Sequence, residues 1–314
     1  MIIVTGGAGF IGSNLVHELN LRGHTDVVVV DDLTDGHKYS NISDACIADY
    51  LDFEEFRAAF LKDEFPFSQI DRIYHLGACS TTTEWDGRFM LDLNYAYSRD
   101  LIRFSIRHGI PIVYASSAAV YGSSTNFSEQ SGNEKPLNVY GYSKNLIDNF
   151  VTRQLSSLKS QVVGLRYFNV YGPREQHKDA MASVAFHLNR QAKESGKVRL
   201  FGGSHGMAAG EQRRDFIFVD DAVDTTLWFA DHSQCSGIFN CGTGRAESFN
   251  ELAAAVLDWH GSGEIEYIPF PSELLEAYQS NTQADLSLLR AAGCDLDYRT
   301  VSEGTGNYLD WLNS

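Results

Sequence analysis

The chain opens with Ile2-Ile3-Val4-Thr5-Gly6-Gly7-Ala8-Gly9-Phe10-Ile11-Gly12, an apolar run followed by glycines spaced three residues apart. An amphipathic stretch follows directly, with apolar residues at 15, 16 and 19. In a strand–turn–helix unit, Gly6 permits the tight turn, Gly9 lets the backbone approach a pyrophosphate, and Gly12 lets helix and strand pack closely. The stretch therefore predicts a dinucleotide-binding turn, with cofactor contacts at Gly6, Gly9, Phe10, Ile11 and Gly12.

A second apolar run ends in Asp31 and Asp32, where such folds recognise a ribose. A carboxylate there favours the free ribose diol of NAD and repels the 2′-phosphate of NADP, unless a cation lies near it. Lys38 is the candidate cation, and a solvated loop lysine is the alternative interpretation. These residues leave the choice between NAD and NADP open.

Short apolar runs alternate with longer amphipathic ones, which is typical of βαβ units. We expect strands at residues 1–5, 25–30, 72–75, 110–115 and 161–166, and helices at 86–108 and 138–155. The predicted fold class is α/β, a Rossmann-type doubly wound parallel sheet with a smaller C-terminal α/β substrate domain. Residues 1–170 form the predicted cofactor domain, with a return around 215–245, and residues 171–314 form mainly the substrate domain.

The composition excludes several classes of protein. The apolar runs are far shorter than the roughly 20 residues needed to cross a bilayer, and no secretory leader precedes the first strand, so we expect a cytoplasmic protein without membrane contact. A net charge of −16 disfavours nucleic-acid partners, which need a basic surface. Five scattered cysteines predict reduced thiols, with neither a disulfide framework nor a metal site.

The chemistry-bearing pattern is Tyr140-Gly141-Tyr142-Ser143-Lys144, which follows a strand ending at Ser116 and Ser117. Four residues make about one helical turn, so Tyr140 and Lys144 share a helix face. An adjacent ammonium and an oxidised nicotinamide both lower a phenol's pKa. We expect Tyr140 to accept a hydroxyl proton, Lys144 to tune it and Ser116 to bind the substrate oxygen, with Ser117 as the alternative.

The chain resembles the extended short-chain dehydrogenase/reductases, and within them the ADP-heptose 6-epimerases. Four strings carry the second resemblance: Ser80-Thr81-Thr82-Thr83-Glu84-Trp85-Asp86, Arg166-Tyr167-Phe168-Asn169-Val170-Tyr171-Gly172-Pro173-Arg174-Glu175, Met181-Ala182-Ser183-Val184-Ala185-Phe186-His187 and Gly242-Thr243-Gly244-Arg245-Ala246-Glu247-Ser248-Phe249. The resemblance implies inversion at carbon 6 of ADP-D-glycero-D-manno-heptose for lipopolysaccharide core synthesis. It also implies one NADP per subunit, held without net consumption, and a homo-oligomer, with a pentamer as one form.

The resemblance also assigns residues. Lys178 lies at the position of the family's second acid/base. A second group is needed because a flat ketone must be approached from opposite faces if the configuration of its carbon is to be inverted. An exposed lysine without a catalytic role is the alternative interpretation of Lys178. Further cofactor contacts are implied at Leu76, Gly77, Ala78, Cys79, Ser80, Asn94, Val170 and Lys178. Substrate contacts are implied at Asn169, Ala180, His187, Phe201, Gly202, Gly203, Ser204, Arg214 and Tyr278. Arg214 also has a physical case, because a guanidinium binds a diphosphate in a fork.

The sequence departs from the family pattern at three places. Phe53 stands where a lysine is expected and Leu76 where a glutamate is expected, which puts one contact to the cofactor phosphate in doubt. The stretch 205–212 is longer than usual and is interpreted as a surface insertion or as a flap over the substrate.

Three other functions remain as alternatives. A UDP-hexose 4-epimerase shares the motifs and is the nearest of them. A nucleotide-sugar 4,6-dehydratase needs an acid and a carboxylate beside the catalytic serine, where this chain has Ala118 and Ala119. A cofactor-sensing regulator without catalysis is disfavoured by the intact Ser116, Tyr140 and Lys144.

Overall fold

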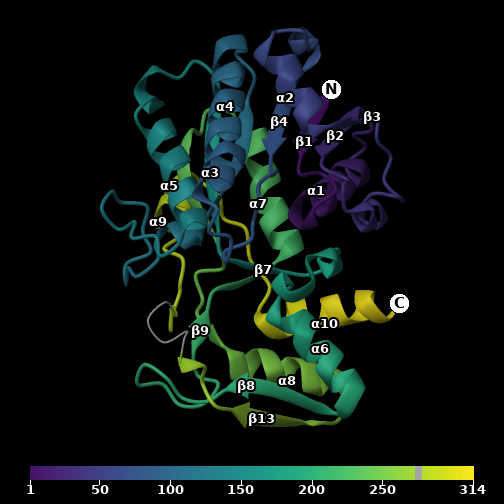
Figure 1. Cartoon of the computed structure of the whole chain (residues 1–314), viewed down its shortest axis with the longest axis vertical. Helices are drawn as coiled ribbons and strands as arrows, with labels where there is room; N and C mark the ends of the chain where they lie inside the picture. Colours follow the sequence, from purple (N-terminus) through teal and green to yellow (C-terminus); the bar gives the residue numbers. More distant parts are fainter. Residues whose placement is uncertain (273–277) are drawn as a thin grey trace. The chain divides into compact units, whose positions relative to one another are not determined.

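The structure is a computed structural model that describes residues 1–272 and 278–314. It divides into two compact units (Figure 1). Unit 1 contains residues 1–120, 136–167 and 223–239, and unit 2 contains residues 121–135, 168–222 and 240–314. The expected boundary near 170 lies close to the unit boundary at 167/168, and residues 223–239 return to unit 1 within the expected range of 215–245. Residues 121–135, expected in the cofactor domain, belong to unit 2.

Unit 1 is built on a seven-stranded sheet in the order β11-β6-β5-β4-β1-β2-β3. The pairings from β6 to β3 are parallel. This strand order, with crossover helices between neighbours, confirms the doubly wound α/β fold. The strands are β1 (Ile2–Thr5), β2 (Val27–Asp31), β3 (Asp49–Asp52), β4 (Arg72–His75), β5 (Ile112–Ser117), β6 (Val162–Tyr167) and β11 (Gly237–Cys241).

Helices cover the sheet of unit 1 because alternate strand residues point to opposite faces. Ile3, Ile73 and Ile112 pack on one face with apolar residues from three helices, α2, α4 and α5. Figure 1 shows α4 and α5 side by side. The helices of unit 1 are α1 (Phe10–Leu21), α2 (Phe53–Leu61), α3 (Gly87–Met90), a π-helical segment (Leu91–Ala96), α4 (Tyr97–His108), α5 (Val139–Thr152) and most of α7 (Val219–Asp231).

Unit 2 has its own core, formed where α6, α8 and α10 pack against β8 and β10. Strand β8 (Lys197–Phe201) pairs in parallel with β13 (Glu264–Ile268), and β10 (Phe216–Phe218) pairs in parallel with β7 (Asn169–Tyr171). Strand β9 (Arg213–Arg214) pairs antiparallel with β12 (Glu247–Ser248). The helices are α6 (Val184–Ser195), α8 (Phe249–His260), α9 (Ser287–Ala291), α10 (Val301–Asn313) and a 3-10 segment, Gln176–Met181.

Capping boxes start two of these helices. Ser248 and Glu251 exchange hydrogen bonds at the start of α8, and Thr300 and Glu303 do so at the start of α10.

None of the helices in the described ranges is both long and apolar enough to cross a membrane.

Candidate active site

The turn between β1 and α1 fits a phosphate group that approaches the backbone closely. Gly6 has a φ of 69°, which favours glycine. A Cβ on Gly12 would stand 2.0 Å from the carbonyl oxygen of Gly6, so only glycine fits there. Gly9 is the N-cap of α1 and has no side chain to cap it, so the first N–H groups of α1, including those of Phe10 and Ile11, can face an anion.

A buried carboxylate links this turn to Lys38. Asp31 accepts a hydrogen bond from the Ala8 N–H at 2.7 Å with one oxygen, and the Lys38 ammonium donates to its other oxygen at 2.7 Å. Hydrogen bonds from Thr34 hold the pKa of Asp32 below its ordinary value. The Lys38 charge is therefore fixed next to Asp31, which offsets the carboxylate that would repel a 2′-phosphate.

Asn94 holds the segment after β4. Its side chain accepts from the Cys79 N–H at 2.9 Å and donates to the Cys79 carbonyl at 2.9 Å. Asn94 is fully buried on the π-helical segment, a local widening of a helix that often occurs at functional sites. The predicted cofactor residues of this segment, Leu76, Gly77, Ala78, Cys79 and Ser80, directly follow β4 at the carboxyl edge of the sheet.

Phe53, found where a lysine was expected, has a structural role. Its ring packs edge-on to Tyr97 at 6.2 Å between centroids and joins the core of unit 1. A cationic side chain at this position would have to leave that contact. The substitution is therefore accommodated by apolar packing.

Tyr140 and Lys144 lie on one face of α5, one turn apart. The ammonium of the buried Lys144 donates to the carbonyl of Ala115 at 2.8 Å and lies 5.9 Å from the centroid of the Tyr140 ring. Burial lowers the pKa of Lys144 to about 8 and raises the pKa of Tyr140, while a hydrogen bond with Ser117 opposes the Tyr140 shift. The effect of burial on the Tyr140 pKa is larger than the predicted lowering by Lys144. Formation of the phenolate at neutral pH therefore needs a further positive charge nearby.

The two serines at the end of β5 are placed differently from the prediction. Ser116 is buried and donates to Asp148 at 2.8 Å, whereas Ser117 is half-buried, accepts from the Ala119 N–H at 3.1 Å and acts to lower the pKa of Tyr140. Successive residues of a strand face opposite ways, so only one of them can reach the phenol. The hydroxyl proton of Ser116, the predicted residue, is therefore engaged by Asp148, whereas Ser117, the stated alternative, is the serine that affects the pKa of the phenol.

Asp148, four residues after Lys144, is a site residue that the sequence interpretation missed. It accepts from Tyr114 at 3.0 Å and from Arg166 at 2.9 Å in addition to Ser116, and its charge raises the pKa of Lys144 against the effect of burial. The Asp148 and Arg166 side chains are 2% and 3% exposed. Removing one partner of such a buried pair costs about 3–5 kcal/mol, so this cluster anchors the β5 end against α5. The spacing of one helical turn from Lys144 was the available signal.

Lys178 lies in the 3-10 segment of unit 2, beside a second buried carboxylate. Burial lowers the pKa of Lys178, and the charge of Glu175 opposes this shift. Glu175 accepts from the N–H and the hydroxyl of Ser183, both at 2.6 Å, and this serine caps α6. Asp179 has a φ of 45°, which marks a sharp turn after Lys178. Lys178 therefore lies near enough to Glu175 for the carboxylate charge to favour the protonated amine.

Arg214 is buried, with 9% of its surface exposed. Of the predicted substrate residues, only Ser204 is less exposed among those that the structure describes. The Arg214 guanidinium lies 4.7 Å from the Tyr278 ring centroid and 5.7 Å from that of Phe249, and no carboxylate within residues 1–272 and 278–314 forms an ion pair with it. Such a cation is suited to a diphosphate. The other predicted residues lie at the start of β7 (Asn169, Val170), before α6 (Ala180), on α6 (His187) and at the end of β8 (Phe201, Gly202, Gly203, Ser204).

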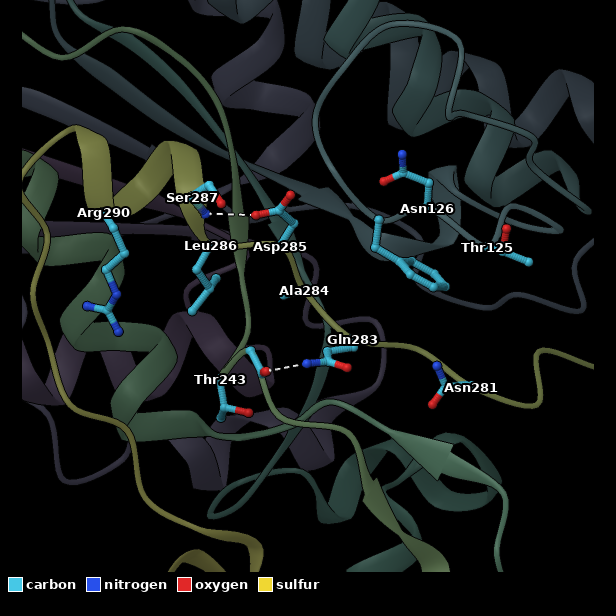
Figure 2. Close-up of a pocket in the computed structure, with 12 residues that line it drawn as sticks. Thr125, Asn126, Thr243, Asn281, Gln283, Ala284, Asp285, Leu286, Ser287 and Arg290 are labelled. Atoms are coloured by element: carbon cyan, nitrogen blue, oxygen red, sulfur yellow. Dashed lines mark hydrogen bonds between the residues drawn. The ribbon is translucent and has the colours of Figure 1, made fainter. Parts of the chain in front are cut away.

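Figure 2 shows a broad hollow of about 810 Å³ in unit 2, which none of the predicted site residues lines. Its charged groups are already engaged: Asp285 accepts from the Ser287 N–H at 2.9 Å, and Arg290 donates to the Leu296 carbonyl at 2.8 Å. Gln283 donates to the Gly244 carbonyl at 2.7 Å. The Arg290 donors are therefore held by backbone carbonyls of the same segment, which leaves the guanidinium poorly placed to bind a phosphate in a fork.

The chain is similar to known epimerases in both sequence and structure. The NAD dependent epimerase/dehydratase family model matches residues 2–242. ADP-L-glycero-D-manno-heptose-6-epimerase from Alkalilimnicola ehrlichii is 61% identical over 310 residues, which cover 99% of this chain and 97% of that protein. The crystal structure of the Helicobacter pylori enzyme of the same name matches with a TM-score of 0.85 at 29% identity, covering 100% of this chain and 96% of that one.

A relative with another substrate shares the fold. UDP-glucose 4-epimerase from Thermotoga maritima, solved with UDP-glucose, matches with a TM-score of 0.80 at 25% identity and covers 99% of this chain and 98% of that one. The backbone alone therefore does not separate the two substrate classes.

Proposed function

Because the chain belongs to the NAD dependent epimerase/dehydratase family, we propose that it interconverts ADP-D-glycero-D-manno-heptose and ADP-L-glycero-D-manno-heptose by inversion at carbon 6. The identity of 61% across nearly the whole length of an enzyme with this name carries the proposal. The site supports it, since Tyr140, Lys144 and Ser117 are assembled at the end of β5. The reaction would serve lipopolysaccharide core synthesis, as the resemblance implies.

The protein residues have distinct roles in this proposal. Tyr140 accepts the proton of the substrate hydroxyl, and Ser117 donates a hydrogen bond to the substrate oxygen. Lys144 contributes positive charge near the phenol. Lys178 acts as the acid/base for the opposite face of the sugar carbon, and Arg214 binds the diphosphate. A bound nicotinamide dinucleotide supplies a reversible hydride acceptor and, when oxidised, a positive charge that favours the phenolate.

The substrate assignment is tested by incubating the purified protein separately with ADP-D-glycero-D-manno-heptose and with UDP-glucose, then separating the epimers by chromatography. We expect the heptose to be converted and UDP-glucose to be recovered unchanged. Conversion of UDP-glucose alone would replace the proposal with the UDP-hexose 4-epimerase alternative.

For the cofactor, we propose NADP, with Lys38 binding the 2′-phosphate. The support is the 2.7 Å ion pair that keeps Lys38 next to Asp31 at the end of β2. Because this lysine carries the only positive charge assigned to the extra phosphate, its effect should be specific to NADP.

Lys38→Ala should weaken NADP binding by about 10- to 100-fold, the value of a charge-assisted hydrogen bond, and leave NAD binding nearly unchanged. Fluorescence titration of the apoprotein with each dinucleotide measures this. Lys62→Ala, at an exposed lysine after α2, is the matched control. Equal loss of affinity for NAD and NADP would contradict the assignment, as would mass spectrometry showing that NAD copurifies with the protein.

A further inference from the structure

The 205–212 segment is tied to the body of unit 2 at several points. The Gly210 N–H donates to the Phe201 carbonyl at 3.0 Å, and the Asn250 N–H donates to the Gly210 carbonyl at 3.0 Å. The side-chain amide of Gln212 donates to the Ser204 hydroxyl at 3.0 Å. Gly210 has a φ of 70°, and a Cβ there would meet Asn250. These contacts describe an anchored hairpin, so the flap interpretation is not supported.

His205 stands at the tip of this hairpin. Met207 donates its N–H to the Ser204 carbonyl at 2.9 Å, and these two residues form an antiparallel bridge. His205 and Gly206 between them both have positive φ, 54° and 77°, which defines a tight primed turn. Non-glycine residues adopt this backbone uncommonly, and histidine is one of those that do so most often.

The His205 ring joins an aromatic group. It is nearly parallel to Tyr278, with 26° between the planes and 6.2 Å between centroids, and it lies 6.1 Å from Phe270. Phe270 and Tyr278 meet edge-on at 5.0 Å. His205 is exposed, and the other two rings are half-buried, so this group keeps solvent-facing ring surface.

A buried cation adjoins the same rings. Arg214 stacks on Tyr278 at 4.7 Å, on β9 of the same unit. In a nucleotide sugar, the diphosphate is linked through one ribose to a flat base. A guanidinium suits the diphosphate, and aromatic side chains suit the face of the base.

We propose that His205, with Phe270 and Tyr278, binds the adenine of the substrate next to Arg214, so that the 205–212 segment is a substrate-recognition element. This inference rests on the proposed function. His205 is a binding residue and takes no part in proton transfer.

The test uses the cofactor-loaded protein and two probes, ADP and inorganic pyrophosphate, in calorimetric titrations. His205→Ala should weaken ADP binding by about tenfold, within the range measured for base stacking, and leave pyrophosphate binding unchanged. His205→Phe, which keeps a ring, should stay within about twofold of wild type on the same basis. His24→Ala, at an exposed histidine of unit 1, is the matched control.

Steady-state kinetics with ADP-D-glycero-D-manno-heptose separate binding from catalysis. His205→Ala should raise KM by the same factor as the loss of ADP affinity and leave kcat unchanged, because uniform binding is lost. Unchanged ADP affinity in His205→Ala, with wild-type protein active on the heptose, would overturn this inference alone. Failure of the wild-type protein both to bind ADP and to convert the heptose would overturn it together with the proposed function.

Discussion

Tyr140→Phe should lower kcat for epimerisation by about 10²- to 10⁴-fold, the contribution typical of one positioned acid/base. The phenol lies on α5, and Ser117 at the end of β5 acts to lower its pKa against the effect of burial. The substitution removes only the hydroxyl oxygen and keeps the ring that packs near Lys144. Initial rates measured by chromatography of the two epimers give the loss, and fluorescence titration should show nearly unchanged dinucleotide affinity.

Tyr142→Phe provides the matched control for this experiment. Tyr142 lies two residues further along α5, so it faces away from the Tyr140 side, and it is 47% exposed. We expect the kcat of Tyr142→Phe to stay within about twofold of the wild-type value, because surface substitutions away from a site have small effects. Full activity of Tyr140→Phe would show that another group accepts the hydroxyl proton.

Lys178→Met should reduce epimerisation by a comparable factor, about 10²- to 10⁴-fold, because the proposed acid/base for the opposite face of the sugar carbon is lost. Methionine keeps an unbranched side chain of similar length in a half-buried place. The amine has a lowered pKa through burial, which brings it closer to neutral pH and improves it as a proton carrier. The same chromatographic assay measures the rate of formation of each epimer.

The control for the second substitution is Lys193→Met, at an exposed lysine on α6 of the same unit. This variant should retain the wild-type rate. ADP affinity should be preserved in Lys178→Met if the lysine acts on the sugar carbon alone. A rate for Lys178→Met equal to that of Lys193→Met would remove the lysine from the proposed mechanism.

Much of the fold follows from local patterns in the sequence. The glycine-rich turn and the apolar runs place β1, β2, β4, β5 and β6 to within two residues, because these strands are buried on both faces and carry continuous apolar residues. Strand β3 was missed because it lies at the sheet edge, and its residues, Asp49 to Asp52, are exposed or half-buried without an apolar run.

Pairing partners are harder to predict than strands. A return is expected around residues 215–245, and β11 joins the main sheet there, whereas β10 pairs with β7 in a separate two-stranded sheet. Partner choice depends on which edges remain free once the larger sheet has formed. That information does not lie within the strand itself.

In the site, the spacing of residues along a helix could be predicted from the sequence, but the orientation of side chains on a strand could not. One helical turn between Tyr140 and Lys144 places them on one face of α5, as predicted. The choice between Ser116 and Ser117 depends on which residue of β5 points toward Asp148, and the sequence carries no sign of that orientation. The sign of the Tyr140 pKa shift depends on burial, which outweighs a lysine whose ammonium is bound to the Ala115 carbonyl.

In the proposed mechanism, Tyr140 and Lys178 move only hydroxyl protons, while the hydrogen on carbon 6 is transferred as hydride and returned. To test this, the wild-type protein equilibrates ADP-heptose in ²H₂O, and carbon-bound deuterium is measured by mass spectrometry and NMR. Both epimers should carry no deuterium at carbon 6. One solvent deuterium at that carbon would contradict the mechanism, because the hydrogen would then have left as a proton.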